Sequence, residues 1–103
     1  TILYNINMYE ILQTEKYLKW FKKLRDNAAK YAITLRISRL KNGSFGDSKS
    51  VGDKVFELRI DIGKGYRVYF TNKENKIILL LIGGNKATQE KDIKKAKELA
   101  SEV

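Results

Sequence analysis

Residues 54–71 read KVFELRIDIGKGYRVYFT and alternate apolar with polar side chains on both sides of the glycines at 63 and 65. A period of two residues is typical of a half-buried strand, so this stretch predicts a β-hairpin over 54–62 and 66–71. A three-residue turn at 63–65 would place apolar side chains opposite one another, for example Ile60 opposite Val68, and would pair Ile62 with Tyr66. A two- or four-residue turn would place them opposite polar ones. We therefore predict the three-residue turn.

Apolar residues recur at every third or fourth position before the hairpin and again near the end of the chain, which indicates helices. In order, we predict a strand over 9–13, a helix from the N-cap Thr14 to Leu24, a helix from Asn27 to Asn42-Gly43, a loop over 43–53, the hairpin, a turn over 72–75, a strand over 77–82 that stops at Gly83-Gly84, and a helix from Thr88 onward. This order predicts one α+β domain over 1–103, with an N-terminal strand, two helices on one face of a small antiparallel or mixed sheet, and a C-terminal helix packed on the same face. Met8 is a candidate natural start, which would leave 1–7 upstream of it.

The composition restricts the chemistry. The 103 residues include 21 Lys+Arg, 12 Asp+Glu and no His or Cys, for a formal net charge of +9. Triads that depend on His or Cys are therefore excluded, and we expect neither a metal nor a cofactor. The positive charge favours a polyanionic partner. No apolar run approaches the ~20 residues of a membrane span, so we expect a cytoplasmic protein without a membrane partner.

If the helices cover the apolar face of the sheet, the other face displays polar side chains. They are Glu57, Arg59, Asp61, Arg67, Tyr69 and Thr71, with Lys49 and Lys54 entering before the hairpin and Lys86 following the double glycine. Cations bind phosphates and a tyrosine ring can stack on a base, so this surface favours single-stranded RNA. The structural alternative is that pairs such as Arg59–Tyr69 and Asp61–Arg67 only stabilise the hairpin, by about 0.2–1 kcal/mol each.

Several strings match a known family in order and spacing. They are YEI at 9–11, GDSKSVG at 46–52, FELRI at 56–60, GYRVYF at 65–70 and GGNKATQ at 83–89, followed by Asp92-Ile93 and Ala96. Together they resemble the RelE/ParE toxin superfamily, in particular its HigB-like branch of addiction-module killer proteins. The match runs from Met8 to the end of the chain.

The resemblance implies a toxin of a type II toxin-antitoxin pair that cuts mRNA, commonly on the translating ribosome, and that a helix-turn-helix antitoxin holds inactive. The ribose 2′-hydroxyl attacks the adjacent phosphate in this reaction, so the site must remove one proton, stabilise a phosphorane and return a proton to the 5′-oxygen. Members of the ParE branch inhibit DNA gyrase and cut nothing, which is one alternative. A plain RNA-binding module is another.

The resemblance also suggests roles for individual residues. Arg59 matches the strand arginine that contacts the scissile phosphate, and Lys86 matches a basic residue after the last strand. Lys49 and Lys54 match family lysines, one of which would be the general base after neighbouring cations lower its pKa.

The histidine or C-terminal tyrosine of many relatives has no counterpart here. The alternatives for the general acid are therefore Tyr69, Lys86 and Gln89. The expected RNA contacts are Arg67, Lys64, Thr88 and Gln89, with Arg67 held by Asp61.

Overall fold

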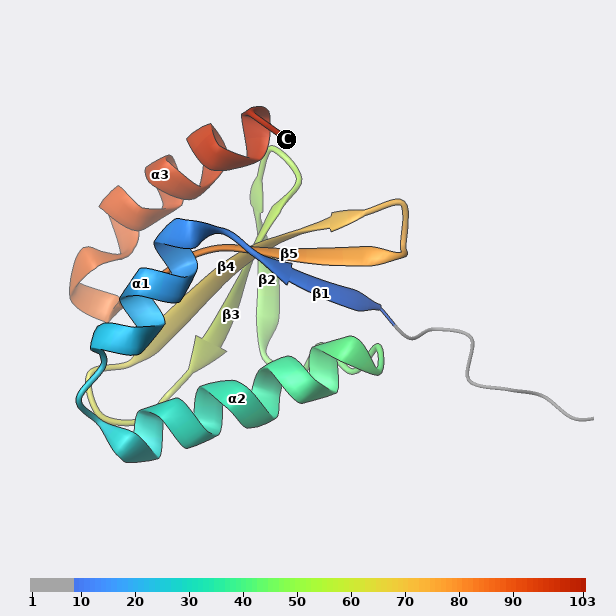
Figure 1. The fold of residues 1–103 in the computed structure, drawn as a ribbon. Helices are drawn as coiled ribbons and strands as arrows, with labels where there is room; N and C mark the ends of the chain where they lie inside the picture. The colour runs from blue at the N-terminus through green and yellow to red at the C-terminus, as the bar shows by residue number, and fades with distance from the viewer. Residues whose placement is uncertain (1–8) are drawn as a thin grey trace, which may run out of the picture.

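The computed structural model describes residues 9–103, so the candidate start at Met8 and the segment 1–7 lie outside the described residues. Its elements are β1 (Glu10–Gln13), α1 (Glu15–Lys23), α2 (Asn27–Lys41), β2 (Ser48–Gly52), β3 (Val55–Ile60), β4 (Tyr66–Lys73), β5 (Ile77–Asn85), the 3₁₀ turn η1 (Lys86–Thr88) and α3 (Gln89–Ser101) (Figure 1). The strands form one sheet in the order β1-β5-β4-β3-β2. Because β1 runs parallel to β5 while the other neighbours are antiparallel, the sheet is mixed. The predicted α+β class is confirmed.

The two N-terminal helices begin where the sequence predicts. The Thr14 hydroxyl accepts a hydrogen bond from the Tyr17 amide at 3.0 Å, and the Asp26 carboxylate accepts one from the Ala29 amide at 3.0 Å. Each bond satisfies a backbone donor that the first turn of a helix leaves free. No helix within residues 9–103 combines the length and apolar character that a membrane crossing requires.

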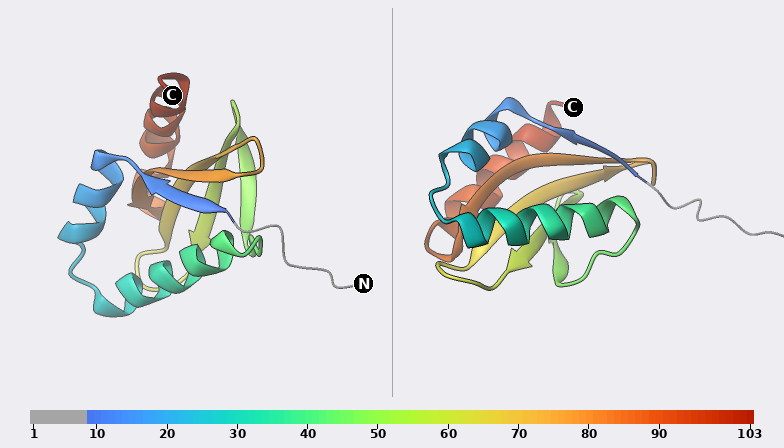
Figure 2. Two further views of the ribbon diagram at one scale, coloured as in Figure 1. Left: turned by 45° about the vertical axis from the view of Figure 1, so that its right-hand side comes forward. Right: turned by 60° about the horizontal axis from the view of Figure 1, so that its bottom comes forward.

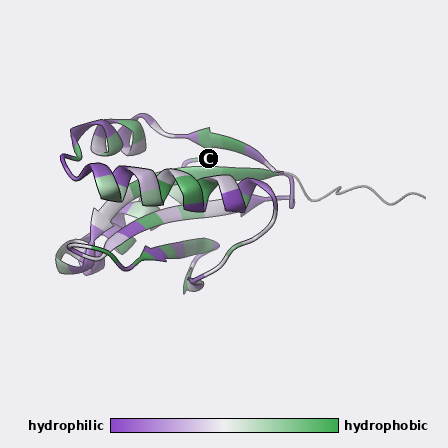
Figure 3. Ribbon diagram, turned by 90° about the horizontal axis from the view of Figure 1, so that it is seen from below, coloured by the Kyte–Doolittle hydropathy of each residue, from purple (hydrophilic) through white to green (hydrophobic). Residues whose placement is uncertain are grey.

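Helices cover both faces of the sheet. On one face, α1 and α2 contribute Tyr17, Ile33 and Leu40 to a buried cluster with Val68 and Phe70. In the right-hand view of Figure 2, α2 lies in front of the strands and α3 behind them. Figure 3 shows hydrophobic and hydrophilic residues alternating along α2, the helix nearest the viewer.

The second face carries its own core, in which Ala96 of α3 packs with Val55, Tyr69 and Leu81. The prediction that all helices share one face is therefore wrong. The physical reason is that residues 77–82 are apolar without interruption, so β5 has side chains to bury on both faces and α3 supplies the second cover.

The hairpin keeps its predicted faces but has a longer turn. Ile60 pairs with Tyr66, so residues 61–65 form the connection and the predicted turn over 63–65 is wrong. Because the register differs by two residues, apolar side chains still oppose apolar ones, as Leu58 does Val68. Ile62 leaves the strand and is 36% exposed. The amide of Gly65, which has a positive φ, donates to the Ile62 carbonyl at 2.9 Å inside this connection.

Residues 43–53 contain an edge strand instead of the predicted loop. Strand β2 pairs antiparallel with β3, with Lys49 opposite Glu57. This edge strand is largely exposed, so its SKSVG sequence does not need to alternate apolar and polar residues. The sequence therefore contains no periodicity from which β2 could be predicted. The turn to β3 uses Asp53 and Lys54, both with positive φ.

The sequence predicts that this strand stops at Gly83-Gly84, but β5 continues through both glycines to Asn85. The two glycines serve opposite faces of the sheet. A Cβ at Gly83 would overlap the Trp20 ring of α1, and a Cβ at Gly84 would overlap the Asp92 carboxylate of α3. The double glycine therefore lets both helices approach the same strand closely.

Candidate nucleic-acid interface

Two arginines lie directly opposite each other on the face of the sheet that α3 partly covers. Arg59 of β3 pairs with Arg67 of β4. Like charges at directly opposed positions destabilise a sheet. Each guanidinium has a carboxylate of its own: Arg59 donates to Asp47 from Nε at 3.2 Å and from Nη2 at 3.1 Å, and Arg67 donates to Asp61 from Nη1 at 3.3 Å. The sheet therefore concentrates two cations at one place, each oriented by an acid from an adjoining loop.

The two arginines differ in their access to solvent. The Arg59 side chain is 37% exposed, whereas that of Arg67 is 6% exposed. A second Arg67 bond, from Nη1 to the Tyr66 carbonyl at 3.1 Å, holds the buried guanidinium. Arg59 can therefore contact an incoming phosphate directly, while Arg67 contributes positive charge from a buried position.

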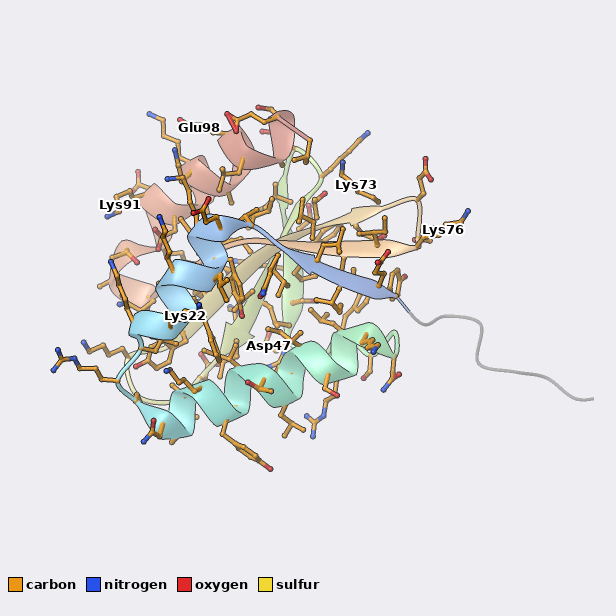
Figure 4. The ribbon with its side chains drawn as sticks, in the orientation of Figure 1. Lys22, Asp47, Lys73, Lys76, Lys91 and Glu98 are labelled. Carbon is orange, nitrogen blue, oxygen red and sulfur yellow. The ribbon has the colours of Figure 1, made fainter. Side chains whose placement is uncertain are left out.

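The segment before β2, which carries Asp47, is tied to α2. Arg36 donates from Nη1 to the Arg59 carbonyl at 2.6 Å and from Nη2 to the Asp47 carbonyl at 3.2 Å. Burial lowers the pKa of Arg36, and the charge of Asp47 opposes that shift. In Figure 4, Asp47 lies close to α2. Sequence reasoning missed Arg36, because a single arginine on a helix carries no signal of what it binds.

Lys86 lies near Arg67, and both side chains pass beside Gly65. A Cβ built at Gly65 would lie 3.3 Å from Cβ of Lys86 and 3.6 Å from Nη1 of Arg67. Since both side chains pass close to that point, the bare backbone of Gly65 provides the space for them. We call Arg59, Arg67 and Lys86 the cationic cluster.

A buried polar group lies beside the cationic cluster. Glu57 is fully buried, and its Oε2 accepts hydrogen bonds from the Tyr69 hydroxyl at 3.0 Å and from Nε2 of Gln89 at 2.6 Å. Burial, reinforced by the Glu57 carboxylate, raises the pKa of Tyr69 far above its ordinary value. Tyr69 is itself fully buried. The prediction that Tyr69 is displayed for stacking on a base is wrong, because its ring is covered. Its role as general acid stays a prediction, which the hydrogen bond to Glu57 disfavours.

Two other predicted RNA contacts have structural partners. The Thr88 hydroxyl accepts a hydrogen bond from the Asn85 amide at 3.2 Å and donates one to the Asp92 carboxylate. The first bond belongs to the capping box of η1, and the second connects η1 to the first turn of α3. The Gln89 amide is bonded to Glu57. Both side chains therefore shape the turn that carries Lys86.

The remaining lysines fall in different places. Lys64 is exposed in the 61–65 connection, next to Gly65, and Lys49 is exposed on β2 opposite Glu57. Lys54 lies in the turn before β3, five residues and roughly 16 Å from Arg59 along the strand. It lines a groove with Lys73 and Lys76. Figure 4 shows these two lysines at the turn between β4 and β5. The structure therefore separates Lys54 from the cationic cluster, against the prediction that it shares the site.

Comparisons with known proteins identify the family and the fold. The model of the family described as "Phage derived protein Gp49-like" matches residues 19–102. An uncharacterised protein of Haemophilus influenzae is 52% identical over 94 residues, which cover 91% of this chain and 95% of that protein. A mutant of the E. coli toxin RelE in the free state superposes with a TM-score of 0.68 at 17% identity, covering 88% of this chain and 96% of RelE.

Two toxin-antitoxin complexes also match. The intact E. coli RelBE complex has a TM-score of 0.59 at 18% identity, covering 75% of this chain and 95% of the matched chain. The RelB-RelE complex of Methanococcus jannaschii has a TM-score of 0.59 at 18% identity, covering 79% and 96%. The chain therefore belongs to the Gp49-like family of phage-derived proteins and has the fold of the RelE toxins.

Proposed function

We propose that this protein is the toxin of a type II toxin-antitoxin pair and that it cleaves mRNA, on the translating ribosome, in the manner of HigB-like toxins. The observation that carries the proposal is the cationic cluster: two arginines occupy directly opposed sheet positions, and Lys86 lies near Arg67 beside Gly65. Direct opposition of two arginines costs a sheet stability, even though each has its own acidic partner. An RNA phosphate, whose negative charge increases during cleavage, would gain from it.

The geometry favours the following division of roles. In the reaction the 2′-oxygen forms a bond to phosphorus and the bond from phosphorus to the 5′-oxygen breaks. The exposed guanidinium of Arg59 has donors beyond the two that bind Asp47, and these would hold the non-bridging oxygens. The buried Arg67 would add positive charge beneath the phosphate site, and Lys86 would make the second contact with the phosphate.

Two proton transfers remain. Lys49 is exposed on the strand next to Arg59 and two positions from it in register, so it would take the proton of the 2′-hydroxyl. Lys86, whose ammonium carries a transferable proton, would give one to the departing 5′-oxygen. Among the three alternatives for the general acid, Tyr69 and Gln89 are each bonded to Glu57, which favours Lys86.

The antitoxin would act by covering this face. Two of the structures that share the fold are complexes of RelE with RelB. A helix-turn-helix antitoxin with an acidic segment would neutralise the cationic cluster and exclude mRNA at the same time.

The test is induction of wild type, Arg59→Ala and Arg39→Ala from a tightly repressed promoter, with mRNA ends mapped by primer extension within minutes. Arg39 is an exposed residue of α2, on the opposite side of the sheet, so its loss matches the change of charge. We expect new 5′ ends within translated frames for wild type and Arg39→Ala and none for Arg59→Ala. Growth arrest with intact mRNA would refute the nuclease and direct attention to gyrase, and the absence of toxicity would favour a plain RNA-binding module.

A further inference from the structure

Glu57 is a buried carboxylate with no cationic partner. None of the ion pairs within residues 9–103 includes it. Its Oε2 receives two neutral donors, from Tyr69 and Gln89, while Oε1 is buried without a hydrogen bond. Removing a carboxylate from water is costly unless it is paired, so stability does not account for an acid at this position.

The two hydrogen bonds of Glu57 connect three elements. Tyr69 belongs to β4, Glu57 to β3, and Gln89 is the first residue of α3, directly after the turn that carries Lys86. The capping box of Asn85 and Thr88 fixes η1 internally. The bond between Gln89 and Glu57 ties the same turn to the centre of the sheet, where Arg59 and Arg67 lie.

We propose that Glu57 is a positioning residue: through Gln89 it fixes η1 over the sheet and so holds the Lys86 ammonium beside Arg67 for the RNA phosphate. The proposal rests on the proposed function for its consequence, but its structural part concerns this chain alone. A carboxylate suits the role because a charged acceptor forms stronger hydrogen bonds than a neutral one, and Oε2 binds two donors at once. Lys86 is exposed, and the first part of its side chain passes beside Gly65, with Cβ 3.3 Å and Cδ 3.9 Å from the position of an added Cβ. The position of η1 therefore decides where the ammonium lies.

The test exchanges the two partners. Gln89→Glu places one carboxylate against another. The double variant Glu57→Gln with Gln89→Glu again has an amide facing a carboxylate, and it has the same net charge as the wild type. Gln13→Glu, at an exposed position of β1, is the matched control for the added charge. Two quantities are measured: amide hydrogen exchange of residues 86–92 in the purified protein, and the rate of mRNA cleavage in a translating extract at limiting and saturating mRNA.

We expect Gln89→Glu to speed exchange over residues 86–92 by about tenfold and to lower the cleavage rate at saturating mRNA by about 10²-fold, with little change in KM. Both effects should be absent in Gln13→Glu and reversed in the exchanged pair.

Unchanged exchange in Gln89→Glu would overturn the proposal. So would an exchanged pair that regains protection but not cleavage, since the Glu57 carboxylate would then itself contact the reacting groups. A wild type that cleaves no RNA would refute the proposed function instead, and the exchange measurement, which needs no substrate, distinguishes the two failures.

Discussion

The adjacent glycines of β5 provide a matched pair of substitutions. A Cβ at Gly83 would lie 2.5 Å from Cδ2 of Trp20, and a Cβ at Gly84 would lie 2.8 Å from Cγ of Asp92 and 2.9 Å from the Thr88 hydroxyl. These separations are shorter than van der Waals contact, so in each variant the obstructing side chain or the helix that carries it must shift. The two alanines differ by one position along the strand and press on opposite faces of the sheet.

The expected losses differ because the obstructing groups differ in freedom. Overpacking costs about 1–3 kcal/mol. Trp20 is only partly buried on α1, so we expect Gly83→Ala to lower the free energy of unfolding by about 1–2 kcal/mol. Asp92 is buried and bonded to Thr88, so Gly84→Ala also strains a charged hydrogen bond, and we expect a loss of about 3 kcal/mol.

Urea unfolding followed by circular dichroism measures both losses, and the mRNA cleavage rate under folded conditions separates the two faces. Gly84→Ala should impair cleavage strongly, because it displaces η1, which carries Lys86 directly before α3. Gly83→Ala should leave cleavage close to wild type. A Gly84→Ala protein as stable as wild type would refute the close-approach argument. Equal loss of cleavage in both variants would refute the placement of the site on the α3 face.

The remaining predictions concern protonation and helix caps. Burial raises the pKa of Tyr17 and of Tyr69, so the unfolded chain, where tyrosine titrates near pH ~10, releases these protons first. The contribution of these two tyrosines to stability should therefore be constant below that pH and fall above it by about 1.4 kcal/mol per pH unit for each tyrosine; urea unfolding against pH, with Tyr69→Phe showing the smaller slope, tests this. Asp26→Ala should lose about 1 kcal/mol through the cap of α2, and Asp26→Asn much less. Thr14→Ala should lose about 2 kcal/mol, because its hydroxyl both caps α1 and donates to a β5 carbonyl at 2.6 Å; thermal melts that show no change in these variants would contradict the capping assignments.

Local patterns were sufficient for most of the fold. Alternation over 54–71 identified the two hairpin strands and their faces, and the caps at Thr14 and Asn42-Gly43 located the helix ends. Strand β2 was missed because an exposed edge strand needs no apolar alternation. The stop at Gly83-Gly84 was wrong because glycine usually interrupts a strand, whereas here it admits a helix on each face.

The residues predicted for the site lie in more than one place. Arg59 and Arg67 are paired and Lys86 lies near Arg67, while Lys54 lies at the other end of β3. Sequence distance misled here: Lys54 and Arg59 are five residues apart, but a strand separates them by roughly 16 Å. Tyr69 was predicted as an exposed ring because nothing in the hairpin pattern tells which face a distant helix will cover.

Composition and periodicity are properties of short stretches, and they sufficed to establish a basic α+β domain without His or Cys chemistry, its strand faces and its cationic residues. The position of α3 could not follow from them, because docking depends on the contacts of Ala96, Asp92 and Gly84 across long separations in the chain. The docking of α3 buries Glu57 and Tyr69, places Gln89 within hydrogen-bond distance of Glu57 and positions Lys86 near Arg67. The selection of a few side chains from a generally basic surface is thus a result of packing between distant segments, which no local pattern records.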